Sequence, residues 1–205
     1  MWIALVLAPT TGWCAAPDLD ALLKRLARPA PAVTPFVEAR FSNLLAKPLI
    51  VSGQLEYMGP ESLARTVTAP FKERTEIKNM AVTVQREGQK PRRFSLKRAP
   101  ELHLLLDSFA ALLGGDGSGL EKQFTLAMRG DDAAWTLVMT PKEPRIKQRI
   151  RDITVTGTAT EPRCLVTTEP NDNANIMLLA AAASTKLPED PQRAWFDDFC
   201  RGARN

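Results

Sequence analysis

The sequence predicts a mainly β protein with helices, an α+β fold in which an antiparallel sheet of about nine or ten strands carries a helix inserted midway and another at each end. Three observations support this prediction. Apolar and polar residues alternate in a long series of short segments, as in strands with one buried face. A strongly apolar segment at residues 100–113 has helical spacing instead. The length of 205 residues, with 44% apolar and 24% charged residues, suits one domain with a sizeable core.

The first residues have the composition of a secretory signal. An apolar run at residues 2–9 precedes small residues and then "PDLD", and it is far shorter than the roughly 20 residues that cross a bilayer. We therefore expect a signal peptide over residues 1–16 and one exported domain over residues 17–205. No Lys or Arg precedes the run, so a start further upstream and an apolar first helix stay open. Bulky Trp13 argues against a lipid-modified Cys14.

Helix and strand signals follow one another along the first half of the chain. Asp18 is a suitable N-cap for an amphipathic helix that ends before Pro29, and the proline-rich segment after it is expected to be an extended connector. Residues 48–70 predict a hairpin around a Gly-Pro turn, because apolar and polar residues alternate on both sides of that turn. Other strands of this half are expected at residues 36–45, 71–78, 80–84 and 94–96.

In the second half, one apolar helix lies between two sets of strands. Residues 100–113 repeat Leu and Phe at helical spacing, and Gly114-Gly115 supplies a stop. Residues 145–151 place a basic side chain at every second position and predict a strand; apolar residues then take the odd positions at Ile153 and Val155, a register change near Asp152 that indicates a bulge or a helical start. A C-terminal helix is expected over residues 188–202. The remaining strands are expected at residues 124–128, 135–139, 163–169 and 175–182.

The residue pattern does not indicate catalytic, metal or nucleotide chemistry. The single histidine, His103, stands in the apolar helix without a second metal ligand at helical spacing. Three acidic residues in Gly-containing turns, Asp116, Asp131 and Asp132, lack the spacing of a calcium loop. No Lys-Ser or Lys-Thr follows the glycine-rich segment, and no G-x-S-x-G motif occurs. We expect no enzyme, no metal and no cofactor.

Charge and cysteines narrow the class of protein further. The net charge of +4 is mild, and Lys and Arg are spread along the chain without an aromatic-basic platform, which argues against nucleic-acid binding. If Cys14 is removed with the signal, Cys164 and Cys200 remain as an even pair in an oxidising compartment, and we expect a disulfide between them. Two buried free thiols are the alternative.

The order of these motifs resembles the periplasmic outer-membrane lipoprotein carrier family, LolA and its relatives. The resemblance rests on "FVEARFSNLL", on the hairpin "SGQLEYMGPESLARTVTAP", and on "DAAWTLVMTPK" followed by "IRDITVTG". The matching positions are Phe41, Gly53, Leu55, Tyr57, Pro60 and Pro70. This family's fold is a strongly curved antiparallel sheet, an incomplete β-barrel with lid helices over an apolar cavity, and its members carry lipoprotein acyl chains across the periplasm.

The resemblance implies a monomeric, non-enzymatic carrier that takes cargo from an inner-membrane donor and gives it to an outer-membrane acceptor. Burial of hydrocarbon contributes about 0.8 kcal/mol per CH₂, so such a site needs apolar lining and no reactive group. In LolA itself an arginine directly precedes the turn proline and helps to hold the lid closed, whereas this chain has Gly59 there, so we do not expect the family's lid latch. A glycolipid or a polyene lipid remains an alternative cargo. The residues expected to contact the cargo are Val51, Leu55, Tyr57, Leu63, Val67, Ile77, Val82, Leu105, Phe109, Leu112, Trp135 and Leu137.

A binding module with a solid core is the alternative function. It would dock on a protein or on an anionic membrane surface through the basic strand expected over residues 145–151. A carrier should copurify with lipid and bind an apolar dye, whereas a solid module should do neither.

Overall fold

The computed structural model describes residues 18–59, 62–115, 117–131, 133–159 and 161–202. The expected signal peptide, Cys14, the turn proline Pro60, and Asp116 and Asp132 lie outside these residues. Within the described residues, no helix combines the length and apolar character needed to cross a membrane.

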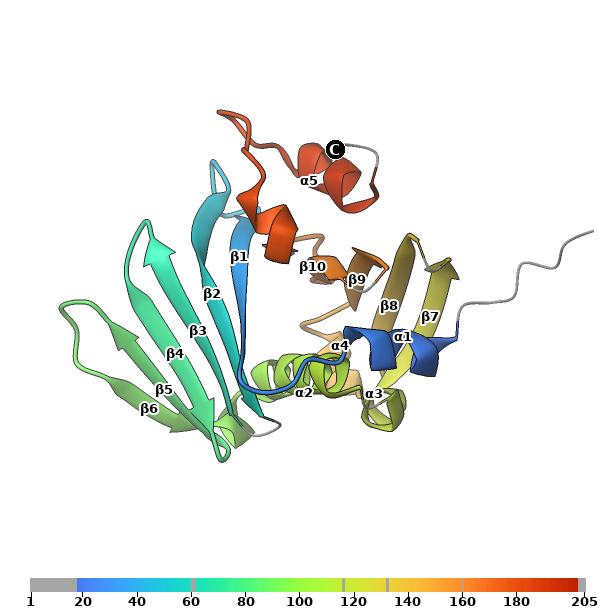
Figure 1. Ribbon diagram of the computed structural model, residues 1–205. Helices are drawn as coiled ribbons and strands as arrows, with labels where there is room; N and C mark the ends of the chain where they lie inside the picture. The colour runs from blue at the N-terminus through green and yellow to red at the C-terminus, as the bar shows by residue number, and fades with distance from the viewer. Residues whose placement is uncertain (1–17, 60–61, 116, 132, 160, 203–205) are drawn as a thin grey trace, which may run out of the picture.

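A single antiparallel sheet organises the described part of the chain, and its eleven strands run in the order β6-β5-β4-β3-β2-β1-β11-β10-β9-β8-β7 (Figure 1). The edge strands β6 and β7 do not pair, so the sheet is curved but not closed. The strands are β1 (Ala32–Phe41), β2 (Leu49–Gly59), β3 (Ser62–Ala69), β4 (Glu73–Lys78), β5 (Ala81–Arg86), β6 (Arg92–Ser95), β7 (Phe124–Gly130), β8 (Trp135–Pro141), β9 (Asp152–Thr158), β10 (Glu161–Thr168) and β11 (Ala174–Leu179). The predicted fold class, mainly β with helices, is confirmed.

The helices lie in the concave space of the sheet and at one of its ends. In Figure 1, α1 and α2 cross between the strands of the first half and those of the second half, whereas α5 lies at the end of the molecule away from α2. The helices are α1 (Leu19–Leu26), α2 (Pro100–Gly114), α3 (Gly117–Gln123), α4 (Pro144–Lys147) and α5 (Arg193–Cys200), with 3₁₀ turns η1 (Leu96–Arg98) and η2 (Ala180–Ser184).

The residues that the sequence suggests as the ends of α1 and α2 cap these helices in the structure. The Asp18 carboxylate accepts a hydrogen bond from the Asp20 backbone N–H at 3.0 Å and caps α1. Pro100 opens α2, where a missing N–H costs nothing. The α2 helix ends at Gly115, whose φ of 72° is left-handed and whose N–H donates to the Ala111 carbonyl. Both predicted helices are confirmed.

The core has two main parts on opposite faces of the sheet. The larger cluster joins α1 and α2 to the concave face and includes Leu22, Leu23, Leu120 and Trp135. A smaller cluster lies under α5 on the other face of the central strands. There the structure joins Cys164 of β10 to Cys200 of α5 by a disulfide, with 5.7 Å between their Cα atoms. The central strands are therefore covered on both faces.

The first strand begins earlier than the sequence predicts. We expected an extended connector before a strand at residues 36–45, but Ala32 to Pro35 already pair with β2, and β1 ends at Phe41. Pairing of β1 with β11 begins only at Phe36. Pro35 therefore has a partner strand on one side only, which accommodates its missing N–H.

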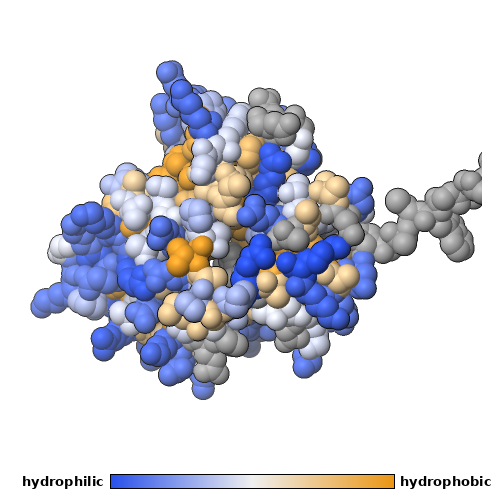
Figure 2. Space-filling view, viewed as in Figure 1, coloured by the Kyte–Doolittle hydropathy of each residue, from blue (hydrophilic) through white to orange (hydrophobic). Residues whose placement is uncertain are grey.

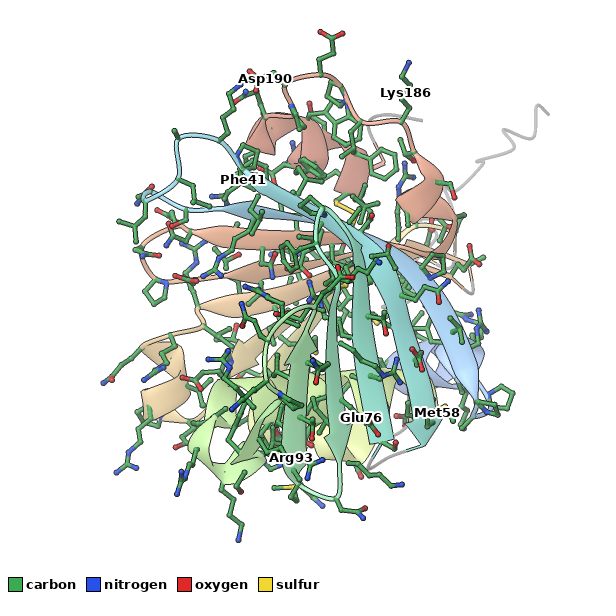
Figure 3. The ribbon with its side chains drawn as sticks, turned by 90° about the vertical axis from the view of Figure 1, so that its left-hand side faces the viewer. Phe41, Met58, Glu76, Arg93, Lys186 and Asp190 are labelled. Carbon is green, nitrogen blue, oxygen red and sulfur yellow. A yellow bond between two sulfur atoms is a disulfide. The ribbon has the colours of Figure 1, made fainter. Side chains whose placement is uncertain are left out.

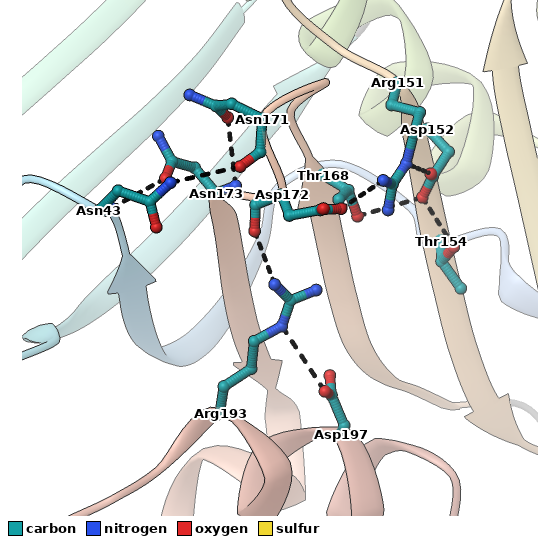
Figure 4. Close-up of polar contacts among 10 residues, drawn as sticks. All are labelled: Asn43, Arg151, Asp152, Thr154, Thr168, Asn171, Asp172, Asn173, Arg193 and Asp197. Carbon is teal, nitrogen blue, oxygen red and sulfur yellow. Dashed lines mark hydrogen bonds and ion pairs between the residues drawn. The ribbon is translucent and has the colours of Figure 1, made fainter.

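The prediction of a basic strand over residues 145–151 is wrong. This segment is the short helix α4 followed by a turn, and β9 starts at Asp152. Ile146 and Ile150, four residues apart, are both buried, which fits one side of a helical turn. Arg151 pairs with Asp152 (Nε–Oδ2, 3.0 Å) and Asp172 (Nη1–Oδ1, 2.5 Å) and ties the start of β9 to the β10–β11 loop (Figure 4).

A helix was also missed after α2. The glycine-rich segment that we expected to be a turn contains α3. A Cβ atom on Gly117 would lie 2.7 Å from Oδ1 of Asp20, so glycine permits the close approach of α3 to α1. This packing depends on a residue distant in sequence.

Candidate functional site

The candidate site is a cavity of about 210 Å³ between α2 and the adjoining ends of β2, β3 and β4. The strands contribute apolar side chains because their alternation turns every second residue toward the concave face. Polar side chains are fewer and come from both sides, Tyr57 and Ser62 from the strands and His103 and Asp107 from α2. The cavity is lined by Tyr57, Gly59, Ser62, Leu63, Ile77, Met80, Leu96, His103, Leu106, Asp107 and Ala110.

Two further cavities adjoin α2 and share lining residues with the first. One of about 340 Å³ shares Tyr57, Asp107 and Ala110 with it and reaches Phe124 of β7. The other, of about 530 Å³, lies toward α4 and shares His103 and Asp107. Asp107 borders all three. Much of α2 therefore lies beside unfilled space.

The polar side chains of α2 at this site already have partners. Asp107 accepts a hydrogen bond from Gln123 Nε2 at 2.9 Å, and its Oδ2 lies 3.5 Å from His103 Nε2. The buried Ser108 hydroxyl donates to the Leu104 carbonyl at 2.7 Å. In the part of the chain that the structure describes, no group of His, Cys, Asp and Glu side chains is placed to hold a metal ion. The arrangement offers apolar contact with a polar margin.

The residues predicted to contact a cargo fall into different environments. Tyr57, Leu63 and Ile77 line the first cavity. Val82 is fully buried and packs with Ile77 and Leu96 in a small cluster beside it. Leu105 and Phe109 lie in α2, but their side chains are outside what the structure describes. Six others belong to the large core cluster: Val51, Leu55, Val67, Leu112, Trp135 and Leu137.

Sequence reasoning missed several residues that line the first cavity. Leu106 belongs to the predicted apolar stripe of α2 and Leu96 to a predicted strand, so the apolar pattern contained a signal for both. Met80 was expected to begin the strand at residues 80–84, but it lies in a turn where Asn79 and Met80 have positive φ values of 49° and 63°. This conformation is uncommon for a residue other than glycine, and nothing local predicts it.

The opposite face of the same hairpin carries a charged network. Arg74 of β4 donates to both carboxylate oxygens of Glu56 on β2, with 3.0 Å between Nη2 and Oε2. Hydrogen bonds from Arg74, and then from Thr66, lower the pKa of Glu56, although burial opposes the shift. The Glu56–Arg74 pair therefore links β2 to β4 on the face away from the cavity. On the concave face, Arg65 of β3 donates to Glu38 of β1 at 2.6 Å, because Arg65 pairs with Leu55 and Glu38 pairs with Val51.

The architecture defines the class to which the protein belongs: a curved, open antiparallel sheet with helices on its concave face and an apolar cavity beneath one of them. Its surface is hydrophilic over much of the face in Figure 2, with small hydrophobic areas among the polar ones. The chain belongs to the outer membrane lipoprotein carrier protein LolA-like family, whose model matches residues 11–201. The predicted family is confirmed.

Solved structures that match most of this chain have low sequence identity and TM-scores below 0.5. A LolA superfamily protein from Nitrosomonas europaea is 10% identical, with a TM-score of 0.45 over 85% of this chain and 96% of that chain. LprF from Mycobacterium bovis is 12% identical, with a TM-score of 0.40 over 86% and 100%. A putative outer membrane lipoprotein-sorting protein domain from Vibrio parahaemolyticus is 8% identical, with a TM-score of 0.42 over 90% and 96%. The search of curated proteins found no match.

Proposed function

We propose that the protein is a non-enzymatic periplasmic carrier that binds an acyl chain of a lipoprotein, or another lipid-like cargo, between α2 and the ends of β2–β4. The observation that carries this proposal is the lining of the first cavity, where apolar side chains face one another from the strands and from α2. Leu63 and Ile77 lie on the strand side, and Leu106 and Ala110 on the helix side. Membership of the LolA-like family supports the same role.

Uptake of a long chain requires α2 to move outward as a lid. The first cavity, at about 210 Å³, is smaller than the 300–1,000 Å³ that is typical of ligand pockets. Outward movement of α2 would join it to the neighbouring cavities. The polar contacts that would break are the Arg149–Glu101 ion pair and the Gln123–Asp107 hydrogen bond, which are partly exposed. Exposed ion pairs contribute only about 0.2–1 kcal/mol, so the cost of opening lies mainly in apolar contacts.

Hydrocarbon burial can offset that cost. Ten methylene groups moved from water into the cavity contribute about 8 kcal/mol before the entropy of binding is subtracted. This estimate assumes complete burial, which the joined cavities would provide. The cargo would be received from a membrane donor and passed to a membrane acceptor by a monomeric carrier.

Native mass spectrometry of the purified protein, with lipid analysis of an organic extract, tests the proposal. We expect a bound lipid at a stoichiometry near one, and competition between extracted lipid and an apolar dye for the same site. A protein that carries no lipid and binds neither dye nor added lipid would contradict the proposal.

A solid-core binding module is the second candidate. The observation that favours it is that six predicted cargo residues, among them Trp135 and Leu137, pack within the main core. The strand through which such a module was expected to dock does not form, because residues 144–147 are helical. The module would therefore depend on a different surface.

A further inference from the structure

We propose a second functional surface, a mouth rim that docks on an anionic lipid surface. The mouth rim consists of Met58, Lys78, Met80, Lys97 and Arg98. Strand register places these residues at one end of the sheet, since Ser62 pairs with both Gly59 and Lys78, and Ala81 pairs with Lys78 and Ser95. The inference goes beyond the carrier role and can be tested on protein without cargo.

Two exposed methionines provide the apolar part of the mouth rim. Met58, near the end of β2, is 55% exposed, and Met80, in the β4–β5 turn, is 39% exposed. Figure 3 shows Met58 at the lower end of the sheet, with Arg93 at the same end of the molecule. The Met80 carbonyl accepts a hydrogen bond from the Leu96 N–H at 2.8 Å, which anchors the turn to η1. The two long apolar side chains therefore stand at the sheet end with large parts in water.

Exposed cations lie at the same end of the sheet as these methionines. Lys78 ends β4, and Lys97 and Arg98 lie in η1, directly after the residue that anchors Met80. Among the described residues none of the three forms an ion pair, in contrast to Arg149 next to α2, which binds Glu101 at 2.5 Å. The charge of the mouth rim is therefore free to attract an anionic partner.

Further cations extend the basic margin on both sides of the mouth rim. Arg93 is exposed on β6, and Arg145 and Lys147 are exposed on α4, which adjoins the start of α2 through the Arg149–Glu101 pair. The exposed carboxylate of Glu76 on β4 lies among them, without an ion pair to another described residue. Glu143, the N-cap of α4, adds a second exposed carboxylate, so the six exposed cations named here still outnumber the two anions and the local field remains positive.

Apolar side chains that project beside Lys and Arg match the chemistry of a bilayer surface. Methionine can enter the boundary between headgroups and acyl chains, while each nearby cation gains about five-fold in binding from anionic headgroups. Met80 also lines the first cavity, so the same surface that would touch the bilayer opens toward the proposed cargo site. An acyl chain could then enter without crossing open water. This shared position favours a lipid surface over an acidic protein as the partner.

Vesicle cosedimentation tests the inference. The probes are phosphatidylcholine vesicles, the same vesicles with about one third phosphatidylglycerol, and soluble polyglutamate. We expect binding only to the anionic vesicles, and weaker binding when salt rises from about 0.1 to 0.5 M. Neutralising the three cations (K78Q, K97Q and R98Q together) should reduce vesicle affinity roughly 100-fold. The double variant M58S/M80N should reduce vesicle affinity about ten-fold without changing its salt dependence. Asn is chosen at position 80 because it tolerates the left-handed backbone there.

A charge-matched control lies at the opposite end of the molecule. The variant R40Q/K47Q/K186Q removes three exposed cations there, and Figure 3 labels Lys186 at that end. It should retain parental vesicle binding. If the control loses as much vesicle affinity as the K78Q/K97Q/R98Q variant, binding depends on net charge alone. If the control loses more, the membrane-binding surface lies at the loop of Leu44, which is 93% exposed. Either result overturns the inference, as does binding to polyglutamate without binding to vesicles. Dye binding by the K78Q/K97Q/R98Q variant, which changes no residue that lines the first cavity, should stay at the parental level, and this separates the test from the carrier proposal.

Discussion

Replacing Ala110 with Phe gives the sharpest test of the proposed cargo site. Ala110 is a half-buried residue of α2 that borders both the 210 Å³ and the 340 Å³ cavities. A phenyl ring at this position would occupy space that we assign to hydrocarbon. If it displaces about four methylene groups, each worth about 0.8 kcal/mol, binding weakens by about 3 kcal/mol. This loss corresponds to a dissociation constant roughly 200-fold higher.

Titration with a fluorescent fatty acid measures the effect, and thermal unfolding checks the fold. The matched control is Ala127→Phe, which adds the same ring at an exposed position of β7. We expect Ala110→Phe to weaken probe binding strongly, Ala127→Phe to leave it unchanged, and both variants to unfold close to the parent temperature. Tight binding by a folded Ala110→Phe variant would show that the hydrocarbon lies elsewhere. A parent that binds no probe would refute the carrier role itself.

Three further predictions concern stability. Cys200→Ser should lower the free energy of unfolding by about 4 kcal/mol on the chain-entropy model, because the bridge spans 36 residues, and denaturant titration measures this loss. Gly53→Ala should cost about 1–3 kcal/mol in thermal unfolding, since its Cβ would lie 1.8 Å from a β3 carbonyl oxygen. Glu56→Gln should remove at most about 1 kcal/mol at neutral pH, because its ion pair with Arg74 is partly exposed. The lowered pKa of Glu56 means that this contribution is present above the unfolded-state pKa and disappears as pH falls through the folded-state pKa, so the variant should lose less stability in acid than the parent.

Each of these stability predictions has its own check. Thiol titration of the denatured, unreduced parent should detect neither Cys164 nor Cys200. Detection of both thiols would show that the disulfide does not form. Gly114→Ala serves as the control for Gly53→Ala, because its Cβ would meet only the Tyr57 hydroxyl at 3.7 Å. A similar loss in both glycine variants would contradict the steric reason. Parallel acid-unfolding curves for Glu56→Gln and the parent would contradict the linkage.

Local pattern was sufficient for most of the fold. Alternation predicts β2 and β3, because one face of each strand packs on the concave core and the other carries charged pairs such as Glu56–Arg74. Helical spacing with a glycine stop predicts α2, because a left-handed C-cap at Gly115 is a local backbone property. The resemblance to the LolA-like family, which depended on the order of such motifs, is confirmed by the match over residues 11–201.

Tertiary contacts decided what local pattern left ambiguous. Around α4, exposed Arg145 and Lys147 flank buried Ile146, and this short stretch fits a strand as well as a helix until Ile150 packs beside Ile146. The α3 helix depends on the approach of Gly117 to α1, and β1 on pairing of Ala32–Pro35 with distant residues of β2. The same holds for the site. Val67 and Ile77 are both apolar, inward-facing strand residues, yet Val67 joins the core and Ile77 borders a cavity. Hydrophobicity alone determines that a side chain avoids water, whereas the three-dimensional fit of its neighbours determines whether space for a ligand remains.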